Sequence, residues 1–207
     1  MYVKICGLRD AGLALHAARE GADAIGVVMS PKSPRHASEA EAEAVVSAVR
    51  SSFPLVDLVL VTNTLPAAEA ARTAARLGFD VLQLHGSYTR DEFDVAREIL
   101  PRVWRATSLD RDPELSAGDR GEERLLLDGS TPGSGEAWDL SRIGPGTPAR
   151  LRLGDDWLLA GGLDPDNVGS AVAEVAPAGV DVSSGVESSP GEKDPDLIAA
   201  FIRAARA

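Results

Sequence analysis

The sequence predicts an α/β protein: a single domain over residues 1–207 that folds as a closed (β/α)8 TIM barrel. Short apolar runs typical of buried strands alternate with helical segments along the whole chain. Cys6 and Ser183 come directly after the first and last runs, and they are 177 residues apart over seven steps. That is about 25 residues per unit, near the ~30 of a typical eightfold barrel. The last two runs also end in small residues, which suit the phosphate loops of such a barrel.

The eight predicted strands are runs of three to six residues, most of them apolar. They are Tyr2–Ile5, Ala24–Met29, Asp57–Val61, Val81–Leu84, Val103–Ala106, Arg124–Leu127, Trp157–Leu159 and Val180–Val182. No shift of composition marks a domain boundary, and no internal repeat is visible. We therefore expect all eight strands to contribute to one barrel.

Local signals mark several of the intervening helices. Capping boxes at residues 38–41 and 89–92 predict two helix starts, and Gly21 and Gly78 stand where two helices should stop. An Asp-Pro pair at residues 164–165, and another at 194–195, are typical of an N-cap followed by a first-turn proline. The polar stretch from residue 110 to 123 predicts a short fifth helix. The turn-rich stretch from residue 141 to 156 predicts a degraded sixth helix.

The rival fold is a doubly wound open sheet, which also alternates strands and helices. That fold favours a glycine-rich fingerprint after its first strand, and Cys6-Gly7-Leu8 does not match it. Eight units rather than five or six also favour closure. We therefore predict the barrel.

Composition and charge exclude several classes of function. The net charge is −11, which disfavours nucleic acid and anionic membranes as partners but is compatible with an anionic small molecule if cations gather at one mouth. One cysteine and three histidines predict neither an internal disulfide nor a zinc site. No apolar run nears the ~20 residues of a membrane span. The N-terminal YVKIC has no leader pattern, so we expect a cytoplasmic protein.

Two loops are candidate phosphate sites. The run GVDVSSGVESSPGEKD, from residue 179 to 194, passes from a strand into small residues at Ser183, Ser184 and Gly185. The run LAGGLDPDNV, from residue 159 to 168, does the same at Gly161 and Gly162. Small residues let backbone amides approach an oxyanion. Ser-Ser-Gly is also common in ordinary turns, so the pairing of the two loops carries the prediction.

Side chains at the carboxyl ends of the strands are the candidates for chemistry. Cys6 as a base and Asp128 as an acid form a candidate pair, on strands that face one another across the mouth. Each candidate has a structural alternative. Cys6 could be an inert buried thiol, Asp128 a turn residue, His85 a packed histidine and Arg35 a solvated loop residue.

Alternation along the strands adds one further expectation. If Cys6 points into the barrel, so does Lys4, and Asp181 does so if Ser183 does. Closure places the last strand beside the first. We therefore predict that Lys4 and Asp181 pair one layer below Cys6, where Lys4 would favour the thiolate.

Motifs in order along the chain resemble the phosphoribosylanthranilate isomerase family. They are KICG at 4–7, SPKSPR at 30–35, QLHG at 83–86, LLD at 126–128, GSG at 133–135 and the two long runs given above. The resemblance implies a (β/α)8 barrel that converts N-(5′-phosphoribosyl)anthranilate into 1-(2-carboxyphenylamino)-1-deoxyribulose 5-phosphate, a step of tryptophan biosynthesis. It implies no cofactor and no metal.

The resemblance also implies roles for single residues. Asp128 would be the general acid and Cys6 the general base. Arg35, His85 and Asp181 would bind the substrate, with Arg35 on the anthranilate carboxylate. The phosphate would lie at the loops 161–162 and 183–185. We expect a monomer rather than a homodimer, with a phosphorylated small molecule as the only ligand.

Two departures and three alternatives accompany this resemblance. His36 stands where the family has an aromatic residue, and Gly129 after Asp128 is less typical. The ketol-isomerase of histidine biosynthesis uses a carboxylate on its first strand, where this chain has Cys6. Indole-glycerol-phosphate synthase relies on catalytic lysines and a longer N-terminal extension. A catalytically silent phosphate-binding barrel is disfavoured because both acid and base are present.

Overall fold

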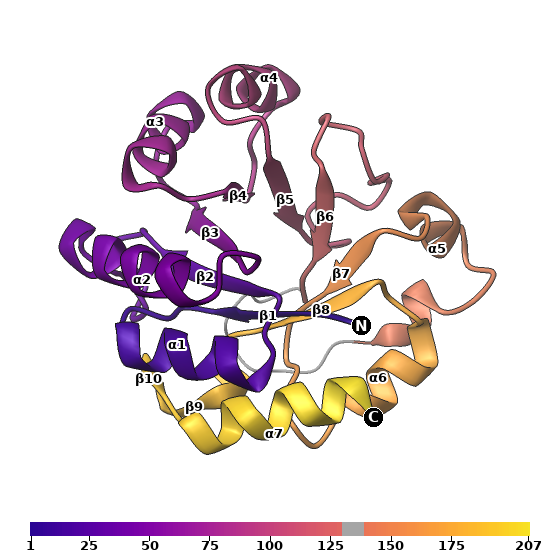
Figure 1. The fold of residues 1–207 in the computed structure, drawn as a ribbon. Coiled ribbons are helices and arrows are strands. Elements are labelled where there is room, and N and C mark those ends of the chain that lie inside the picture. The colour runs from indigo at the N-terminus through magenta and orange to yellow at the C-terminus, as the bar shows by residue number, and fades with distance from the viewer. Residues whose placement is uncertain (130–138) are drawn as a thin grey trace.

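The computed structural model describes residues 1–129 and 139–207, and its eight parallel strands close into a barrel in chain order. β8 pairs with β1 and so completes the closure (Figure 1). The strands are β1 Tyr2–Cys6, β2 Ala24–Val28, β3 Asp57–Thr62, β4 Val81–His85, β5 Val103–Thr107, β6 Arg124–Leu127, β7 Trp157–Leu159 and β8 Gly179–Val182. The predicted barrel is confirmed, and every predicted strand agrees with its observed bounds to within one residue.

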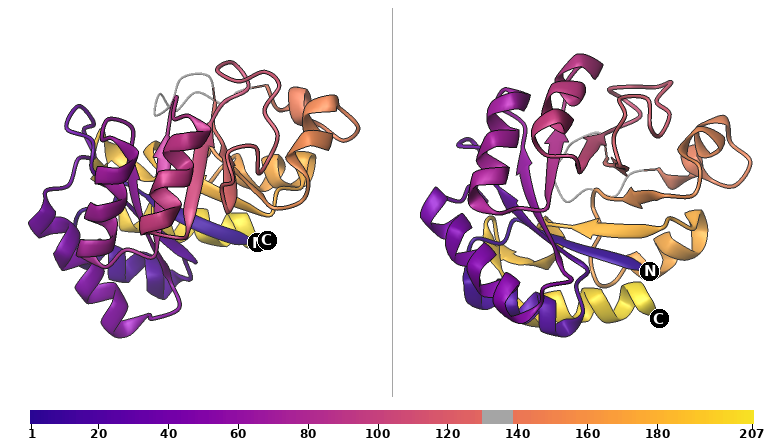
Figure 2. Two further views of the ribbon diagram at one scale, coloured as in Figure 1. Left: turned by 90° about the horizontal axis from the view of Figure 1, so that it is seen from above. Right: turned by 45° about the horizontal axis from the view of Figure 1, so that its top comes forward.

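Helices surround the barrel, as the three views in Figures 1 and 2 show. They are α1 Ala11–Glu20, α2 Glu39–Ser52, α3 Ala67–Leu77, α4 Arg90–Ile99, α5 Pro148–Leu153, α6 Val168–Val175 and α7 Pro195–Arg206, with 3-10 turns η1 Leu140–Ile143 and η2 Ser184–Val186. A small antiparallel hairpin, β9 Glu187–Ser189 and β10 Glu192–Lys193, follows η2. Among the described residues no helix is long and apolar enough to cross a bilayer.

The predicted helix signals are confirmed at most positions. Both capping boxes form at the starts of α2 and α4, and Gly21 and Gly78 end α1 and α3 in the left-handed conformation. Pro195 follows the N-cap Asp194 of α7 as predicted. The prediction at Asp164 is wrong. Its carboxylate accepts backbone hydrogen bonds within a turn, and α6 starts only at Val168.

The helix predicted to be short after β5 is absent from the described residues 108–123, which form turns. Gly118 and Gly121 adopt positive φ angles of 84° and 76° there, which break a helix. Arg152 of α5 holds the segment in place by donating to the backbone oxygen of Leu115. After β6, η1 and the six-residue α5 take the place of a full sixth helix, as predicted.

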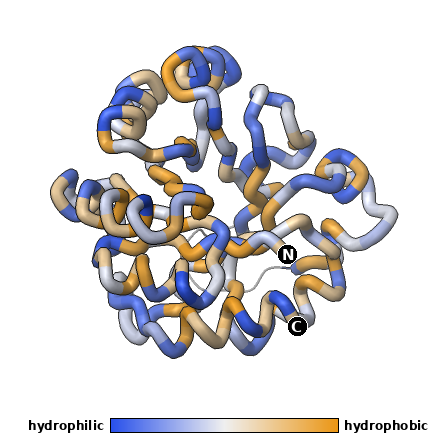
Figure 3. Tube along the Cα trace, in the orientation of Figure 1, coloured by the Kyte–Doolittle hydropathy of each residue, from blue (hydrophilic) through white to orange (hydrophobic). Residues whose placement is uncertain are grey.

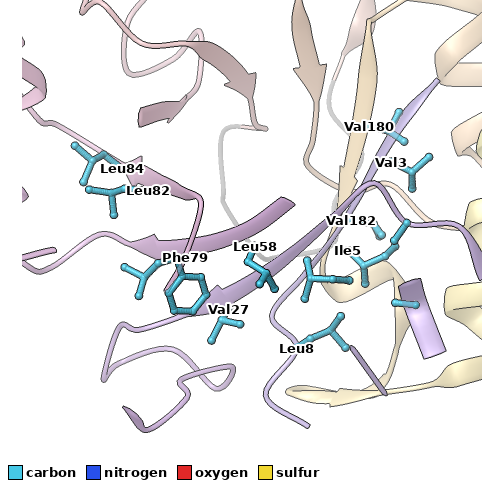
Figure 4. Close-up of a cluster of buried hydrophobic side chains, with 14 of the residues drawn as sticks. Val3, Ile5, Leu8, Val27, Leu58, Phe79, Leu82, Leu84, Val180 and Val182 are labelled. Atoms are coloured by element: carbon cyan, nitrogen blue, oxygen red, sulfur yellow. The ribbon is translucent and has the colours of Figure 1, made fainter. Parts of the chain in front are cut away.

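Alternation along the strands divides the core into two layers. Val3 and Ile5 of β1 face the helices and pack with Val180 and Val182 of β8, as Figure 4 shows. The intervening residues face the barrel interior, where Trp104 is fully buried. The helices carry both hydrophobic and hydrophilic residues (Figure 3), as expected of elements with one buried face.

Aromatic packing fills one end of the barrel interior. The rings of Tyr2 and Trp104 meet edge to face with centroids 6.1 Å apart, and the Arg124 guanidinium lies 4.5 Å from the Tyr2 ring. The Tyr2 hydroxyl donates to Asp57 at 2.6 Å. These contacts occupy the end where strand β1 begins, so a ligand cavity forms at the end where the strands finish.

Candidate active site

A cavity opens at the carboxyl ends of the strands, where the sequence places its candidate residues. Five predicted site residues line it together with Ser183 of the predicted phosphate loop. The lining consists of Cys6, Val28, Ser30, Ser33, Arg35, Val61, Thr62, Asn63, Gln83, His85, Leu126, Asp128, Asp181 and Ser183. The candidate acid and base thus face one cavity from β1 and from the end of β6, as alternation and closure predict.

Cys6 is a free, buried cysteine at the end of β1. Its thiol fits because β2 carries Gly26 beside it: a Cβ at Gly26 would lie only 2.9 Å from Cys6 Sγ. Burial raises the pKa of the Cys6 thiol above its ordinary value, and the positive charge of Lys4 opposes that rise. Lys4 therefore acts in the predicted direction, but burial outweighs it.

The predicted pair of Lys4 and Asp181 is confirmed. The two residues are register partners on β1 and β8, and Lys4 Nζ donates to Asp181 Oδ1 at 2.7 Å. Lys4 has no exposed surface. Burial acts to lower its pKa, but the charges of Asp181 and Cys6 more than offset it, so the pKa of Lys4 lies above its ordinary value. The amine is therefore charged beneath the cavity.

Asp128 has the environment of a general acid. Its residue is 8% exposed, and burial raises its pKa to about 6. The backbone N–H of Gly129 donates to its Oδ1 at 2.8 Å and opposes that rise. Gly161 of the β7 loop packs against the same carboxylate, because a Cβ there would lie 2.6 Å from Oδ1. The departure at Gly129 thus leaves the acid in place.

His85 ends β4 beside this carboxylate. Its Nε2 lies 3.7 Å from Asp128 Oδ2, beyond hydrogen-bond distance. Burial, assisted by the charge of Arg111, lowers the pKa of His85 to about 4. The imidazole is therefore neutral at pH 7 and can donate or accept a hydrogen bond from a substrate.

Arg35 is partly neutralised by a residue that sequence analysis did not single out. Its Nε and Nη2 donate to the two carboxylate oxygens of Glu187 at 2.7 and 2.8 Å. Lys193 Nζ also donates to Glu187, at 2.7 Å. Burial acts to raise the pKa of Glu187, but these hydrogen bonds lower it to about 2. Glu187 lies two residues after the predicted phosphate loop at 183–185, and this position is the one signal that the sequence offers.

The two predicted phosphate loops touch, but their residues do not all line the same cavity. Gly185 lies against the backbone carbonyl of Leu163 and has no room for a side chain, which joins the β8 loop to the β7 loop. Ser183 faces the cavity of Cys6, whereas Gly161 and Gly162 line a neighbouring hollow with Leu163. Ser184 begins η2. The predicted GSG motif at 133–135 lies outside the described residues.

Neither departure from the family pattern changes the acid or the base. His36 bridges to Val28 at the end of β2, near Arg35. In the part of the chain that the structure describes, no group of three His, Cys, Asp or Glu residues is arranged to hold a metal ion. The side chains available for chemistry are therefore a thiol, carboxyl groups, an imidazole and cations.

Comparison with known proteins gives one consistent family. Residues 3–204 match the family described as N-(5'phosphoribosyl)anthranilate (PRA) isomerase. N-(5'-phosphoribosyl)anthranilate isomerase of Hyphomonas neptunium is 39% identical over 217 residues, covering 99% of this chain and 97% of that protein.

Solved structures agree with this match. TrpF from Jonesia denitrificans superposes with a TM-score of 0.87 at 48% identity, over 100% of this chain and 97% of that one. Phosphoribosyl anthranilate isomerase from Thermotoga maritima also gives a TM-score of 0.87, at 36% identity over 100% and 98% of the two chains. The chain therefore belongs to the N-(5'-phosphoribosyl)anthranilate isomerase family.

Proposed function

We propose that this chain isomerises N-(5′-phosphoribosyl)anthranilate to 1-(2-carboxyphenylamino)-1-deoxyribulose 5-phosphate, with Asp128 as general acid and Cys6 as general base. The observation that carries the proposal is that both groups line one cavity, Cys6 from β1 and Asp128 from the end of β6. A solved relative, 35% identical with a TM-score of 0.84, is described in complex with the reduced form of that product. Family membership supports the same reaction.

In this mechanism Asp128 acts first. Its carboxyl group donates a proton to the furanose ring oxygen as the bond from that oxygen to C1′ breaks, and the anthranilate nitrogen lone pair forms an iminium with C1′. A general acid works best when its pKa lies near the working pH. With a pKa of about 6, about a tenth of the Asp128 side chains carry the proton at pH 7.

Cys6 acts on the opened chain. Its thiolate removes the proton from C2′, and the electron pair of that C–H bond neutralises the iminium to give an enolamine. The enolamine becomes the ketone when a proton leaves the 2′ hydroxyl and another adds to C1′. The buried cation Lys4 favours the thiolate, and the positive iminium formed in the first step favours it further.

The two anionic groups of the substrate are assigned to two sets of residues at the barrel mouth. Arg35 lines it from the β2 loop and would bind the anthranilate carboxylate. Ser183, with the backbone amides at 161–162 and 184–185, would bind the phosphate, because small residues let an oxyanion approach those amides. His85 and Asp181 also line the cavity and would contact the sugar.

A turnover assay tests the proposal. The purified protein is mixed with N-(5′-phosphoribosyl)anthranilate, and loss of the substrate's anthranilate fluorescence is followed. We expect loss at a rate proportional to enzyme concentration, and little loss with Cys6→Ser or Asp128→Asn. A folded wild-type protein that leaves the fluorescence unchanged would contradict the proposed activity.

We also propose that residues 1–207 act as one catalytic domain, as a monomer, in the cytoplasm. The proposed base and acid, Cys6 and Asp128, line one cavity within a single copy of the chain. A general base that is a free thiol needs a reducing compartment. Light scattering during size-exclusion chromatography measures the oligomeric state, and a dimer mass would contradict the monomer.

A further inference from the structure

Glu187 lies where three segments of the barrel mouth meet, and the mechanism above gives it no role. Its side chain is 4% exposed. The carboxylate accepts two hydrogen bonds from Arg35, one from Lys193 and one from the backbone N–H of Gly191 at 3.1 Å. A carboxylate offers about four acceptor positions. These four donors therefore account for its whole capacity.

The bonds to Glu187 use only one side of the Arg35 guanidinium. A guanidinium carries five N–H groups in a rigid plane, and Glu187 accepts one from Nε and one from Nη2. The remaining three lie on Nη1 and on the outer side of Nη2. One N–H of Nη1 and the outer N–H of Nη2 form a second fork, of the shape that binds a carboxylate with two parallel hydrogen bonds. Glu187 thus fixes the plane of Arg35, and within residues 1–129 and 139–207 no other group accepts a hydrogen bond from this fork.

The same carboxylate is tied to the strand that carries the base. Lys193, whose side chain is 2% exposed, donates to Glu187 and also to Ser183, at 2.7 Å to the backbone oxygen and 3.2 Å to Oγ. Ser183 Oγ in turn donates to the backbone oxygen of Cys6 at 3.2 Å. The position of Arg35 is therefore set relative to Cys6 by a short chain of hydrogen bonds.

Backbone contacts hold the two loops at the same separation. Lys193 and Glu187 are register partners in the β9–β10 hairpin. Gly191 at the turn of this hairpin lies against Pro34, since a Cβ there would be 2.6 Å from the Pro34 carbonyl oxygen. Its φ of 88° also favours glycine. The hairpin consequently docks on the loop that carries Arg35.

We propose that Glu187 is a positioning residue that holds Arg35 with its free fork toward the cavity and so selects substrates bearing a carboxylate on the aromatic ring. The proposal rests on the proposed function, in which Arg35 binds that carboxylate. A guanidinium fixed before binding loses less side-chain entropy when the ligand arrives. Glu187 also spares the free protein an unpaired, largely buried cation.

The test compares two ligands in Glu187→Gln and the wild type. One is the reduced product analogue, and the other is the same molecule without its ring carboxylate. Glutamine keeps the size of the side chain but offers a single acceptor oxygen and no charge. We expect Kd for the carboxylated ligand to rise about tenfold, the size of one lost charge-assisted hydrogen bond, and Kd for the other to stay unchanged. KM should rise more than kcat falls.

Three further variants complete the design. Glu192→Gln is the matched control, since Glu192 lies on the same hairpin and pairs with Arg9 at the surface at 2.8 Å. Glu187→Asp keeps the charge but has a side chain shorter by one methylene, so it should weaken binding of the carboxylated ligand selectively. It serves as the test if Glu187→Gln does not fold. Arg35→Ala should remove the carboxylate preference, and adding Glu187→Gln to it should cost nothing more.

Two results would overturn the proposal. Equal weakening of both ligands would show a general structural role for Glu187, and no weakening of either would show no role in binding. The proposed function is tested separately by turnover of the wild type. A wild type without turnover would contradict the proposed function, whatever the ligand affinities of the Glu187 variants. If the wild type turns over substrate and Glu187→Gln keeps the preference for the carboxylated ligand, only the role proposed for Glu187 is contradicted.

Discussion

Two buried ion pairs flank the cavity, and they are built in different ways. Lys4 and Asp181 lie inside the barrel on adjacent strands, where the register of β1 and β8 sets them opposite each other. Arg35 lies on the loop after β2 and Glu187 at the start of β9, 152 residues apart in sequence, and their meeting depends on how the β9–β10 hairpin docks. The first pair is a consequence of strand geometry, and the second of loop packing.

The two pairs also act on different parts of the reaction. Lys4 and Asp181 both influence the pKa of Cys6 and that of Asp128, so the interior pair sets the charge state of base and acid together. Arg35 and Glu187 do not shift the pKa of Asp128. We therefore expect the interior pair to act mainly on the charge states of the acid and the base, and the loop pair to act mainly in substrate recognition. Substitutions can test this division.

The largest effect is expected at the acid on which the interior pair acts. Asp128→Asn removes the proton donor and should lower kcat by about 10²–10⁴-fold, the usual contribution of a general acid. Binding of the reduced product analogue should change little, because the proton is needed only in the transition state. Turnover and calorimetric Kd measure the two quantities. If Kd rises as far as kcat falls, Asp128 is a binding residue and the acid lies elsewhere.

Removing one member of the interior pair should be the next most severe change. Lys4→Met leaves Asp181 buried without its partner, and such a loss costs about 3–5 kcal/mol in the free energy of unfolding. Lys4 lowers the pKa of both Cys6 and Asp128, so both limbs of the pH profile of kcat/KM should move to higher pH. Urea unfolding and the pH profile measure these effects.

The double variant Lys4→Met with Asp181→Leu sharpens the same experiment. Replacing a whole buried ion pair by apolar residues is often neutral for stability. We expect the free energy of unfolding to recover while kcat stays low. Recovery of both would mean that the pair serves the fold alone and that its influence on the acid and the base is without consequence.

A smaller loss is expected at the loop pair. Arg35→Ala should raise KM by about 10–100-fold, the size of a lost hydrogen bond to a charged group. It should lower kcat less, since the carboxylate contact exists in both ground and transition states. Steady-state kinetics measure both constants. A fall in kcat as large as that of Asp128→Asn would erase the division between the two pairs.

The contrast between the pairs also explains what the sequence predicts and what it does not. The period of two along a strand, with closure of the barrel, is enough to place Lys4 beside Asp181 and both beneath Cys6. Strand ends likewise place Asp128 and His85 at the mouth. Nothing periodic relates Glu187 to Arg35, because Arg35 lies on a loop, where side chains have no fixed direction, and β9 is not a strand of the barrel. The contact becomes visible only when the hairpin and the β2 loop are placed in space.

Local signals fail in the same way where tertiary contacts compete with them. The Asp164-Pro165 pair has the form of a helix start, yet Asp164 caps a turn and α6 begins at Val168. The expected short helix after β5 is replaced by turns that Arg152 holds against α5. Capping boxes at 38–41 and 89–92 succeed because both hydrogen bonds of each box lie within four residues.

The smallest expected effect separates the two pairs by pH. Contacts with Arg35 and Lys193 bring the folded pKa of Glu187 down to about 2, against an ordinary 4.5. Glu187 therefore contributes stability above about pH 4.5 that is lost as the pH falls toward 2. The folded pKa of Lys4 is raised above 10.5, so its contribution is complete below pH 10.5 and is lost as the pH rises through the folded value.

Unfolding by urea between pH 2.5 and 6, and again above pH 9, resolves this difference. The stability gap between the wild type and Glu187→Gln should narrow as the pH falls below about 4.5, because protonation removes from the wild type the charge that the variant already lacks. Lys4 stays charged throughout the acid range, so its titration should not change the stability difference between the wild type and Lys4→Met there. That difference should narrow only at alkaline pH. Parallel curves for the wild type and Glu187→Gln would mean that the charge of Glu187 adds no stability.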